Sequence, residues 1–524
     1  MKKNPFLLTF YTLLLITLIK GIFWSGLIPA WQAPDEQNHF SLSQFFAETG
    51  KVSVHPKYHN TVSAEILSAT NLMNLDWSGV HPVWRPQFSN TALGPNEEKV
   101  INIKKEERKT FILKGNGRKS PPIYFILGGM IYTIFSPFDI LVRLYMMRFL
   151  SIILGVLTVA FSYFLVKEIY PARNFLALTV ASLVSFHPSF NFVTSTFSPD
   201  AGVIFLATLF SFFGVKYLKK TQTNFKDNLS LLVISFLGIL TKATFIPLSL
   251  VGVLAIIFRE ILAKSRKNNI VIVLIFFVAL AVLYFVFSPS FGFLKDLLTF
   301  LSFENFKLLP ASLVAYFKAA IPYYNGQVFS WYWAVFGWLE VSLPVEIYRA
   351  LKLLTIISII GVGLQLLMEF YRKTLKNSKI ILFLALVLIF LYFGIFFFDW
   401  QTFARTGELF GFQGRHFLAP ISIHMLILSA GLTVFWKKFQ SIIFLLLINF
   451  FIFINLFSTF TIVNYFYPAG NFTTFVKFAS QYKPIFFKFP AILIFGAFYL
   501  LLLVLFLFQL VFLFTKADKK NEIG

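Results

Sequence analysis

The sequence contains no cysteine and is poor in charged residues. Without cysteine among its 524 residues, the chain can form no disulfide bridge, thiol nucleophile or cysteine-ligated metal centre. Asp, Glu, Lys and Arg together make up 13% of the residues, whereas a soluble protein carries roughly 25%. This shortage of charge disfavours a soluble multidomain protein.

Hydrophobic residues are correspondingly abundant. They make up 57% of the chain, phenylalanine alone contributes 71 residues, and the mean hydropathy is +0.74. The 46 basic residues outnumber the 23 acidic ones, and they stand in short clusters between long apolar runs. Membrane proteins that keep positive charge in their cytoplasmic loops show this distribution, so the excess does not indicate a nucleic-acid partner. We predict an all-α polytopic membrane protein.

A membrane-spanning helix needs about 20 mostly apolar residues, and the chain supplies about twelve such segments. The first, residues 6–28, has no clear signal-peptidase site and is interpreted as a retained helix. Placing both termini and the basic clusters in the cytoplasm leaves long outer loops at 29–120 and 288–346. The expected spans are 6–28, 141–166, 174–193, 201–218, 229–241, 243–258, 270–287, 348–369, 380–398, 417–436, 440–463 and 489–514.

Two segments depart from the simple spanning pattern. Residues 121–138 are apolar enough to span, but the charge rule then fails for the next loop, so we expect a helix in the outer interface. The short pair of segments around Lys242 is expected to be tilted or partly re-entrant. We predict one transmembrane module over 1–436, followed over 437–524 by C-terminal transmembrane helices and a short cytoplasmic tail.

The long outer loop holds many of the acidic residues, most of which are expected to be solvated surface charges. Asp35 and Glu36 differ because they follow Pro34 soon after the first span. An amphipathic surface helix beginning there would bring Asp35, Glu36 and His39 onto neighbouring turns. The carboxylates could cap the helix, or one could act as a general base at the membrane surface. A divalent metal on this turn is a third interpretation, although the two-histidine spacing of zinc proteases is absent.

Several later residues are candidates for binding an anionic group. Lys242 interrupts an apolar stretch, where a lysine is either functional or extends its ammonium to the interface. Arg415 could hold two phosphate oxygens, with Gly414 beside it allowing close approach of the backbone. Asp200 begins a span, so capping is its simplest role. The aromatic residues of 329–340 could stack a sugar ring or belong to an interfacial belt.

These motifs, in this order, resemble the GT-C superfamily of integral membrane glycosyltransferases. The likeness covers about residues 6–430 and is closest to a bacterial membrane-protein family of unknown function. Where that family more often has Asp and Tyr, this chain has Glu340 and His416. The matching segments are Pro34-Asp35-Glu36 with His39-Phe40, Ala47 to Gly50, Ser120-Pro121-Pro122-Ile123-Tyr124, Arg143 to Gly155, Ser198-Pro199-Asp200, Thr241-Lys242, Phe336-Gly337-Trp338-Leu339-Glu340, Leu343-Pro344, and Gln413-Gly414-Arg415-His416-Phe417 with Pro420.

The resemblance implies a GT-C-like fold with interfacial helices in the long first outer loop. It also implies an inverting glycosyltransferase at the outer face of the bacterial inner membrane. The donor would be a polyprenyl-phosphate-linked sugar, the acceptor a glycan, lipid or protein, and no cofactor or metal would be required. The implied site residues are Asp35 and Glu36 for catalysis, His39, Lys119, Tyr124, Lys242, Arg415 and His416 for the donor phosphate, and Asp200 and Gln413 in support.

The donor phosphate needs fixed cations beside the reacting groups. We therefore expect Lys242 and Arg415 to converge on one cavity that faces Asp35. Two other functions stay open: a transporter or flippase of a lipid-linked glycan, and an O-antigen ligase or polymerase. A transporter places ionisable residues near the membrane midplane, whereas this chain keeps most charges outside the predicted spans, which favours an enzyme.

Overall fold

The computed structural model describes residues 5–51, 61–75, 85–113, 121–221, 225–263, 309–372, 377–488 and 490–521. The predicted all-α class is confirmed, since the described strands are short pairs beside long helices. Seven described helices are long and apolar enough to cross a membrane. They are α1 (Pro5–Leu27), α6 (Ile140–Ile169), α9 (Pro199–Lys219), α17 (Val345–Tyr371), α18 (Ser378–Thr406), α20 (Gln440–Phe466) and α22 (Ala491–Asn521).

The number of spans differs from the predicted twelve. The segments expected at 229–241, 243–258 and 417–436 form the helices α10 (Phe225–Thr241), α11 (Ile246–Ala263) and α19 (Ile421–Phe435), none of which is among the candidate spans. The span expected at 270–287 lies outside the described residues. The described part therefore holds seven candidate spans, or eight if one bent helix pair is counted as a span.

The bent pair corrects the prediction of one continuous helix over 174–193. Helix α7 (Asn174–Phe186) and helix α8 (Pro188–Thr194) meet at an angle of 63°. Pro188 has no backbone N–H, and a proline disfavours helical geometry in the residue before it. His187 accordingly adopts an extended conformation, and its side chain accepts a hydrogen bond from the backbone N–H of Phe190.

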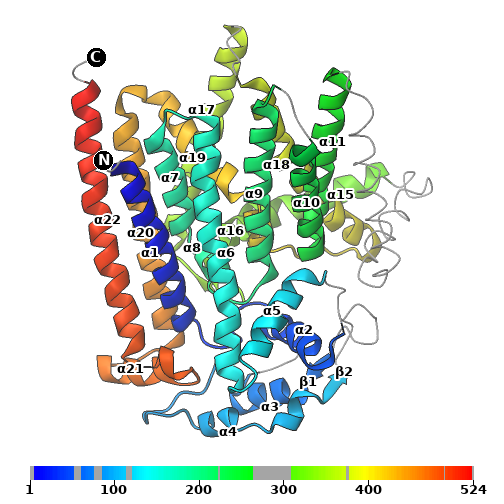
Figure 1. Ribbon diagram of the computed structural model, residues 1–524, viewed down its shortest axis with the longest axis vertical. Coiled ribbons are helices and arrows are strands. Elements are labelled where there is room, and N and C mark those ends of the chain that lie inside the picture. Colours follow the sequence, from blue (N-terminus) through cyan, green and yellow to red (C-terminus); the bar gives the residue numbers. More distant parts are fainter. Residues whose placement is uncertain are drawn as a thin grey trace.

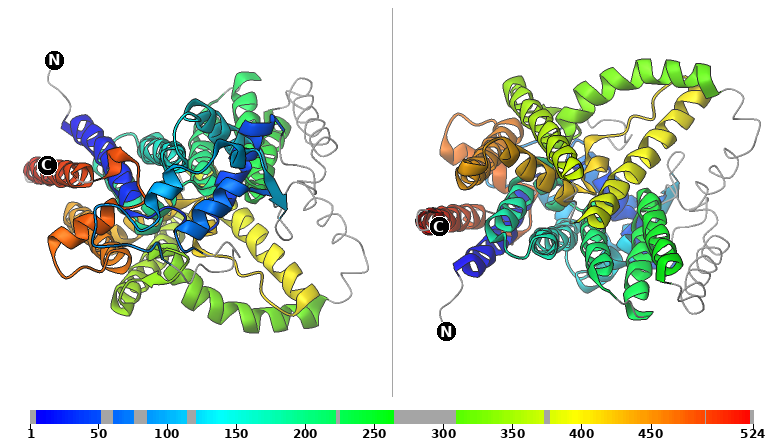
Figure 2. Two further views of the ribbon diagram at one scale, coloured as in Figure 1. Left: turned by 90° about the horizontal axis from the view of Figure 1, so that it is seen from below. Right: turned by 90° about the horizontal axis from the view of Figure 1, so that it is seen from above.

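The first outer loop forms a small layer at one end of the helix bundle (Figure 1). Seen from below, its segments lie across the helix ends (Figure 2). Strands β1 and β2 pair antiparallel within this layer. Its elements are α2 (Glu36–Thr49), β1 (Thr61–Ser63), α3 (Ala64–Leu72), α4 (Glu97–Ile101), the 3-10 helix η2 (Lys105–Arg108), β2 (Phe111–Leu113) and α5 (Ile123–Ile134).

Helix α5 occupies the segment that we expected to lie in the interface. Its 12 residues rise only about 18 Å, which is too short to cross the hydrocarbon core. It packs closely on α2, because a Cβ added at Gly129 would lie 2.9 Å from the backbone oxygen of Ser43. Leu127, Met130 and Ile134 on its other face are exposed.

The remaining described elements connect the helices. A short antiparallel hairpin, β3 with β4, follows α16. These connecting elements are η3 (Ala243–Phe245), α15 (Leu309–Tyr323), the π-helical turn η4 (Tyr324–Val328), α16 (Phe329–Ala334), β3 (Val335–Phe336), β4 (Val341–Ser342), η5 (Gly414–Leu418), η6 (Lys437–Phe439), α21 (Phe472–Ser480) and η7 (Ile485–Phe487).

Buried ion pairs hold the loop layer in place, so some of its acids are not among the solvated surface charges that we expected most of them to be. The Glu65 side chain is 1% exposed and accepts hydrogen bonds from Arg108 and Arg143. Glu97 is buried too and pairs with Lys488, near the start of α22. In the sequence, Arg143 stands out as a charged residue within an apolar segment, but the sequence does not indicate which acidic residue it pairs with.

The two ends of the described chain lie together, away from the loop layer. Helix α1 begins and α22 ends at the end of the bundle opposite α2–α4 (Figure 1). This arrangement separates the loop layer from the turn at η6. The orientation that we predict puts the loop layer outside the cell membrane.

Labelling of single cysteines tests this orientation without background, because the chain has no native cysteine. Asn102 and Lys438 are exposed residues at opposite ends of the bundle. With the outer envelope permeabilised, a membrane-impermeant maleimide is expected to label Asn102→Cys and to leave Lys438→Cys unlabelled. The reverse pattern would overturn the orientation, and equal labelling of both in intact cells would contradict the fold.

Candidate active site

The turn between α1 and α2 carries the acidic pair in a strained conformation. Trp31 and Asp35 both have positive φ, 63° and 65°, which costs a residue with a side chain on the order of 1–3 kcal/mol. Asp35 occupies the N-cap position of α2 but makes no capping hydrogen bond with its side chain. The capping interpretation of Asp35 is therefore not supported. Its carboxylate is directed elsewhere.

Glu36 lies beside Asp35 in sequence but in a different environment. Its two carboxylate oxygens lie 2.7 Å from Nε and 2.7 Å from Nη2 of Arg148, and neither side chain is exposed. The same oxygens accept hydrogen bonds from the backbone N–H groups of Trp31 and Phe197. The carboxylate is thus engaged on all sides. It links α2 to α6 and to Phe197, which lies just before α9.

Arg148 in turn collects the backbone at the end of α1. Its guanidinium donates to the carbonyl oxygens of Ser25, Ile28 and Pro29 at 2.8–2.9 Å. These carbonyls belong to the last turn of α1 and the residues after it. The turn that presents Asp35 is therefore fixed on a charged side chain of α6.

Asp35 is paired with Arg415, which lies 380 residues later in the sequence. Nη2 of Arg415 lies 2.6 Å from Oδ2 of Asp35, and Nη1 donates to the Pro34 carbonyl at 3.0 Å. The third guanidinium nitrogen, Nε, lies 3.6 Å from Oδ2 of Asp200. Arg415 thus stands between two carboxylates.

Asp200 continues the series of alternating charges to Lys242, whose Nζ lies 2.5 Å from Oδ1 of Asp200. Asp200 does not cap α9, as its simplest interpretation predicted, because Ser198 is the N-cap and accepts from the Asp200 N–H. Lys242 lies at the break between α10 and η3 and is directed at this carboxylate. The structure brings together Asp35, Arg415, Asp200 and Lys242 from four separate segments.

Asp35, Glu36 and Asp200 differ in how much of each side chain is exposed to solvent. The Asp35 side chain is 40% exposed, whereas that of Asp200 is 5% exposed and that of Glu36 is fully buried. A substrate can therefore reach Asp35 far more easily than the other two carboxylates.

The charges around Asp35 set its protonation. Burial raises the pKa of its carboxyl group, but the charge and hydrogen bond of Arg415, with the charge of Lys242, together lower it by more, so the pKa lies below its usual range. Burial lowers the pKa of His39 to about 4, which leaves the ring neutral at pH 7. Since a carbonyl can only accept, Nδ1 of His39 donates to the oxygen of Phe197 at 3.1 Å. Asp35 is thus an ionised carboxylate beside a neutral imidazole.

The other predicted donor-binding residues occupy varied positions. His416 folds back on its own turn, with Nδ1 3.2 Å from the backbone nitrogen of Gln413, and burial lowers its pKa to about 3. Tyr124 is buried, and its hydroxyl lies 2.6 Å from the Ser151 hydroxyl. Lys119 lies outside the described residues.

A glycine is required at position 414 for a different reason from the one that we expected. A Cβ at this position would lie 2.1 Å from the backbone nitrogen of Tyr332. The glycine therefore lets η5 pack against the backbone of α16, and it places Arg415 and Trp331 close to one another. The sequence predicted a close approach of the backbone at Gly414, but it did not show that the approaching group is the backbone of α16 in the same chain.

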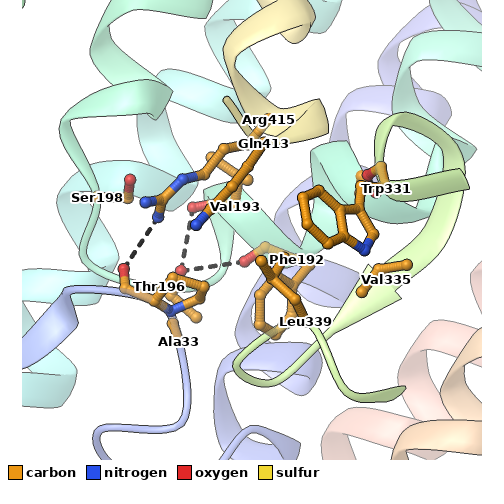
Figure 3. A pocket seen from close by; sticks show the side chains of 12 residues that line it. Ala33, Phe192, Val193, Thr196, Ser198, Trp331, Val335, Leu339, Gln413 and Arg415 are labelled. Carbon is orange, nitrogen blue, oxygen red and sulfur yellow. Dashed lines mark hydrogen bonds between the residues drawn. The ribbon is translucent and has the colours of Figure 1, made fainter. Parts of the chain in front are cut away.

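Two pockets flank this contact between η5 and α16. The first is small and is lined by Arg415, Gln413, Trp331 and neighbours from α8 and the β3–β4 hairpin (Figure 3). The second is an apolar cavity of about 450 Å³ between α16, α17, α18 and α19, with Tyr332 and Phe417 on its wall. Since Arg415 and Phe417 share η5, the charged and apolar sites are neighbours.

No metal site accompanies the charges in the described part of the chain. Among those residues, no group of three His, Asp or Glu side chains is arranged to hold a metal ion. The carboxylates are instead directed at lysine and arginine. Such an arrangement provides one accessible base and two cations, which suits chemistry on an anionic substrate.

Comparison with known proteins relates most of the chain to a family. The family described as "Predicted membrane protein (DUF2142)" matches residues 18–425. These boundaries agree with the extent of the likeness seen in the sequence. No curated protein matches the chain.

The solved structures that match the chain have little sequence in common with it. ArnT from Cupriavidus metallidurans in the apo state is 13% identical, with a TM-score of 0.37 over 83% of this chain and 62% of that one. The oligosaccharyltransferase of Archaeoglobus fulgidus, in complex with zinc and sulfate, is 12% identical, with a TM-score of 0.41 over 90% and 53%. This chain therefore spans less than two thirds of either protein. ArnT bound to undecaprenyl phosphate is 12% identical, with a TM-score of 0.39 over 97% and 77%.

The buried pair between Glu36 and Arg148 is expected to contribute strongly to stability. Arg148→Met leaves an unpaired buried carboxylate, which typically costs about 3–5 kcal/mol. As a matched control, Lys219 pairs with Glu168 at 3.2 Å, with side chains 35% and 27% exposed, and such pairs contribute about 0–1 kcal/mol. Thermal unfolding in detergent should show a large loss for Arg148→Met and little change for Lys219→Met. Equal losses would contradict the anchoring role.

Proposed function

This chain belongs to the family of predicted membrane proteins DUF2142, and we propose that it is an inverting membrane glycosyltransferase. It would transfer a sugar from a polyprenyl-phosphate donor to an acceptor at the outer face of the bacterial inner membrane. The observation that carries the proposal is the meeting of Asp35, Arg415, Asp200 and Lys242 at the end of the bundle that holds the loop layer. The order of sequence motifs that resembles the GT-C superfamily supports it.

Asp35 is proposed as the general base. Its carboxylate is ionised and is the most exposed of the three acids around the site. Glu36, which we expected to share in catalysis, is fully engaged by Arg148 and is proposed as a positioning residue. Because only one carboxylate is accessible, the site favours a single displacement with inversion over a double displacement through a carboxylate nucleophile.

Arg415 and Lys242 are proposed to bind the donor phosphate. Asp35 takes the proton of the acceptor hydroxyl, and the acceptor oxygen forms a bond to the anomeric carbon of the sugar. The bond between that carbon and the phosphate oxygen breaks, so polyprenyl phosphate leaves with the electron pair. Fixed cations in a water-poor site stabilise the negative charge that grows on the phosphate.

The same cations pair with the carboxylates of Asp35 and Asp200. Donor phosphate would compete with Asp35 for the Arg415 guanidinium, whose planar group suits two phosphate oxygens. Release from Arg415 removes the main influence that lowers the pKa of Asp35, so it makes this carboxylate a better base. Donor binding therefore prepares the base for the acceptor.

The apolar cavity next to η5 supports a lipid-linked donor. It holds about 450 Å³ and is lined mainly by aromatic and aliphatic side chains from α16 to α19. Two of these helices, α17 and α18, are candidate spans, so the cavity lies within the membrane-spanning part of the bundle. An aliphatic chain placed there would end near Arg415 at η5.

A transporter or flippase of a lipid-linked glycan remains the second candidate. Its support is Lys20, which is buried within α1 and contacts the Ser185 backbone. A transporter would change where a lipid-linked glycan is found, whereas a transferase changes which glycosidic bonds exist. Mass spectrometry of surface glycans and glycolipids, with and without the gene, separates the two.

Removing the base should abolish transfer. Asp35→Asn keeps the size of the side chain but not its basicity, and loss of a general base typically lowers the rate about 10²–10⁴-fold. Glu98→Gln, an exposed acid of the same loop, serves as the control. Transfer of labelled sugar from lipid extracts should be lost in Asp35→Asn and retained in Glu98→Gln. Normal transfer by a folded Asp35→Asn protein would rule out this role.

Changes to the cations should act on the donor. Lys242→Met is expected to raise the apparent KM for the donor or lower turnover by about tenfold or more, the loss typical of a charge-assisted contact. Arg415→Lys should also be impaired, because a point charge cannot hold two oxygens in the plane of a guanidinium. Lys219→Met again serves as the control. Donor kinetics unchanged in both site variants would contradict the phosphate assignment.

A further inference from the structure

We propose that the small pocket between Arg415 and Trp331 binds the sugar ring of the donor. This assignment rests on the proposed function and adds the place where the sugar is recognised. The two walls of the pocket differ in chemistry (Figure 3). Gln413 and Arg415 stand on one side, and the indole of Trp331 stands on the other with Val335 and Leu339.

The polar wall carries hydrogen-bonding atoms that the described residues do not satisfy. The Gln413 amide oxygen is buried and has no hydrogen-bond partner in the described part of the chain, and buried Nε of Arg415 faces Asp200 at 3.6 Å, beyond hydrogen-bond distance. A buried polar atom without a partner costs about 1–3 kcal/mol. Each such atom in a native structure calls for an explanation. A ligand with hydroxyl groups and an adjoining phosphate would supply both partners.

The opposite wall is flat and apolar. A sugar ring has hydroxyl groups around its edge and C–H bonds on its faces, so it is itself polar on one part and apolar on another. An indole face is electron-rich and attracts positively polarised hydrogens. A pocket with a Trp331 face opposite an amide therefore matches a sugar ring better than a purely apolar chain or a free anion.

The backbone of Trp331 is held on two sides, and its ring makes an edge-to-face contact with Tyr323, with the ring centroids 6.1 Å apart. The Trp331 carbonyl oxygen accepts a hydrogen bond from Ser189 at 3.0 Å, and Gly414 packs against the peptide that follows it. Other aromatic residues of this segment serve packing: Trp333 is buried, and buried Trp338 donates its Nε1–H to the Trp31 carbonyl. Trp331 differs from both because its side chain is only partly buried and lines the pocket that also holds Gln413 and Arg415.

The β3–β4 hairpin also shows backbone strain at this pocket. Leu339 has a φ of 70°, which is unusual for a branched side chain. Such strain persists only where surrounding contacts require it, and it is found most often at functional sites. Here it places Leu339 on the wall near Trp331. The centre of a water molecule can occupy only about 20 Å³ of this pocket, so binding of a sugar ring requires the Trp331 and Gln413 side chains to rotate apart.

The position fits the donor sugar rather than a remote glycan unit. One oxygen atom joins the anomeric carbon to the phosphate, so the sugar must lie within a few ångströms of the phosphate-binding cations. Arg415 satisfies this requirement because it lines the pocket and also contacts Asp35. Pro34, next to the proposed base, lines the same pocket. A ring bound there has a base and a cation at its edge.

Binding measurements can separate the sugar from the phosphate. The probes are undecaprenyl phosphate alone and undecaprenyl phosphate carrying glucose, galactose, mannose, N-acetylglucosamine or arabinose, each titrated into the full chain in detergent. For the wild type, at least one sugar-bearing lipid is expected to bind about tenfold more tightly than the bare lipid, the effect of one good contact. Trp331→Leu and Gln413→Met should lose this advantage while keeping the affinity for bare lipid. Trp436→Leu, at an exposed tryptophan, should keep both.

Other results of these titrations would contradict the sugar pocket, the phosphate assignment or the proposed function separately. If bare lipid binds but no sugar adds affinity, or if Trp331→Leu keeps the full advantage, the sugar pocket is wrong and donor binding stands. If Lys242→Met and Arg415→Lys bind bare lipid as tightly as the wild type, the phosphate assignment fails instead. If no lipid phosphate binds, the proposed function fails and the pocket assignment with it.

Discussion

The site depends on the buried pair between Glu36 and Arg148. Removing both charges from water is costly, and a close pair with further hydrogen bonds offsets that cost. Backbone N–H groups from two segments donate further hydrogen bonds to the Glu36 carboxylate. The Arg148 guanidinium donates to three carbonyl oxygens at the end of α1. The pair therefore fixes the angle between α1, α2 and α6. It also holds the turn in which Asp35 can keep a left-handed conformation.

Similar pairing recurs throughout the outer layer. Glu65 joins Arg108 and Arg143, and Glu97 joins Lys488 from the opposite end of the chain. These contacts attach the long loop to α6 and to the segment before α22. The described parts of the loop are therefore fixed to the helix ends at several charged contacts. Catalytic groups mounted on the loop can be held to the small tolerances that group transfer requires.

The sequence predicted what depends on local pattern. The first span, the break at Lys242 and the helix after Pro34 follow from apolar runs and from residues that start or interrupt helices. The meeting of Asp35, Lys242 and Arg415 followed from the chemistry expected of them. The partner of Glu36 could not be found, because Arg148 is 112 residues away and nothing in the sequence distinguishes it from Arg143 in the same helix. Pro188 marks the break between α7 and α8 in the sequence, because a proline interrupts the apolar segment 174–193, but our prediction kept this segment as one span.

The four charges of the site add up to zero when it is empty. Two carboxylates balance one lysine and one arginine, so the resting site needs no counter-ion from solvent beside the low dielectric of the membrane. In the proposed reaction, the arriving phosphate makes this balance negative, and the spent lipid phosphate remains after the sugar has been transferred. Asp35, once it has lost its proton, can again pair with Arg415. The base then acts as an internal competitor that helps expel the product lipid and resets the site for another turnover.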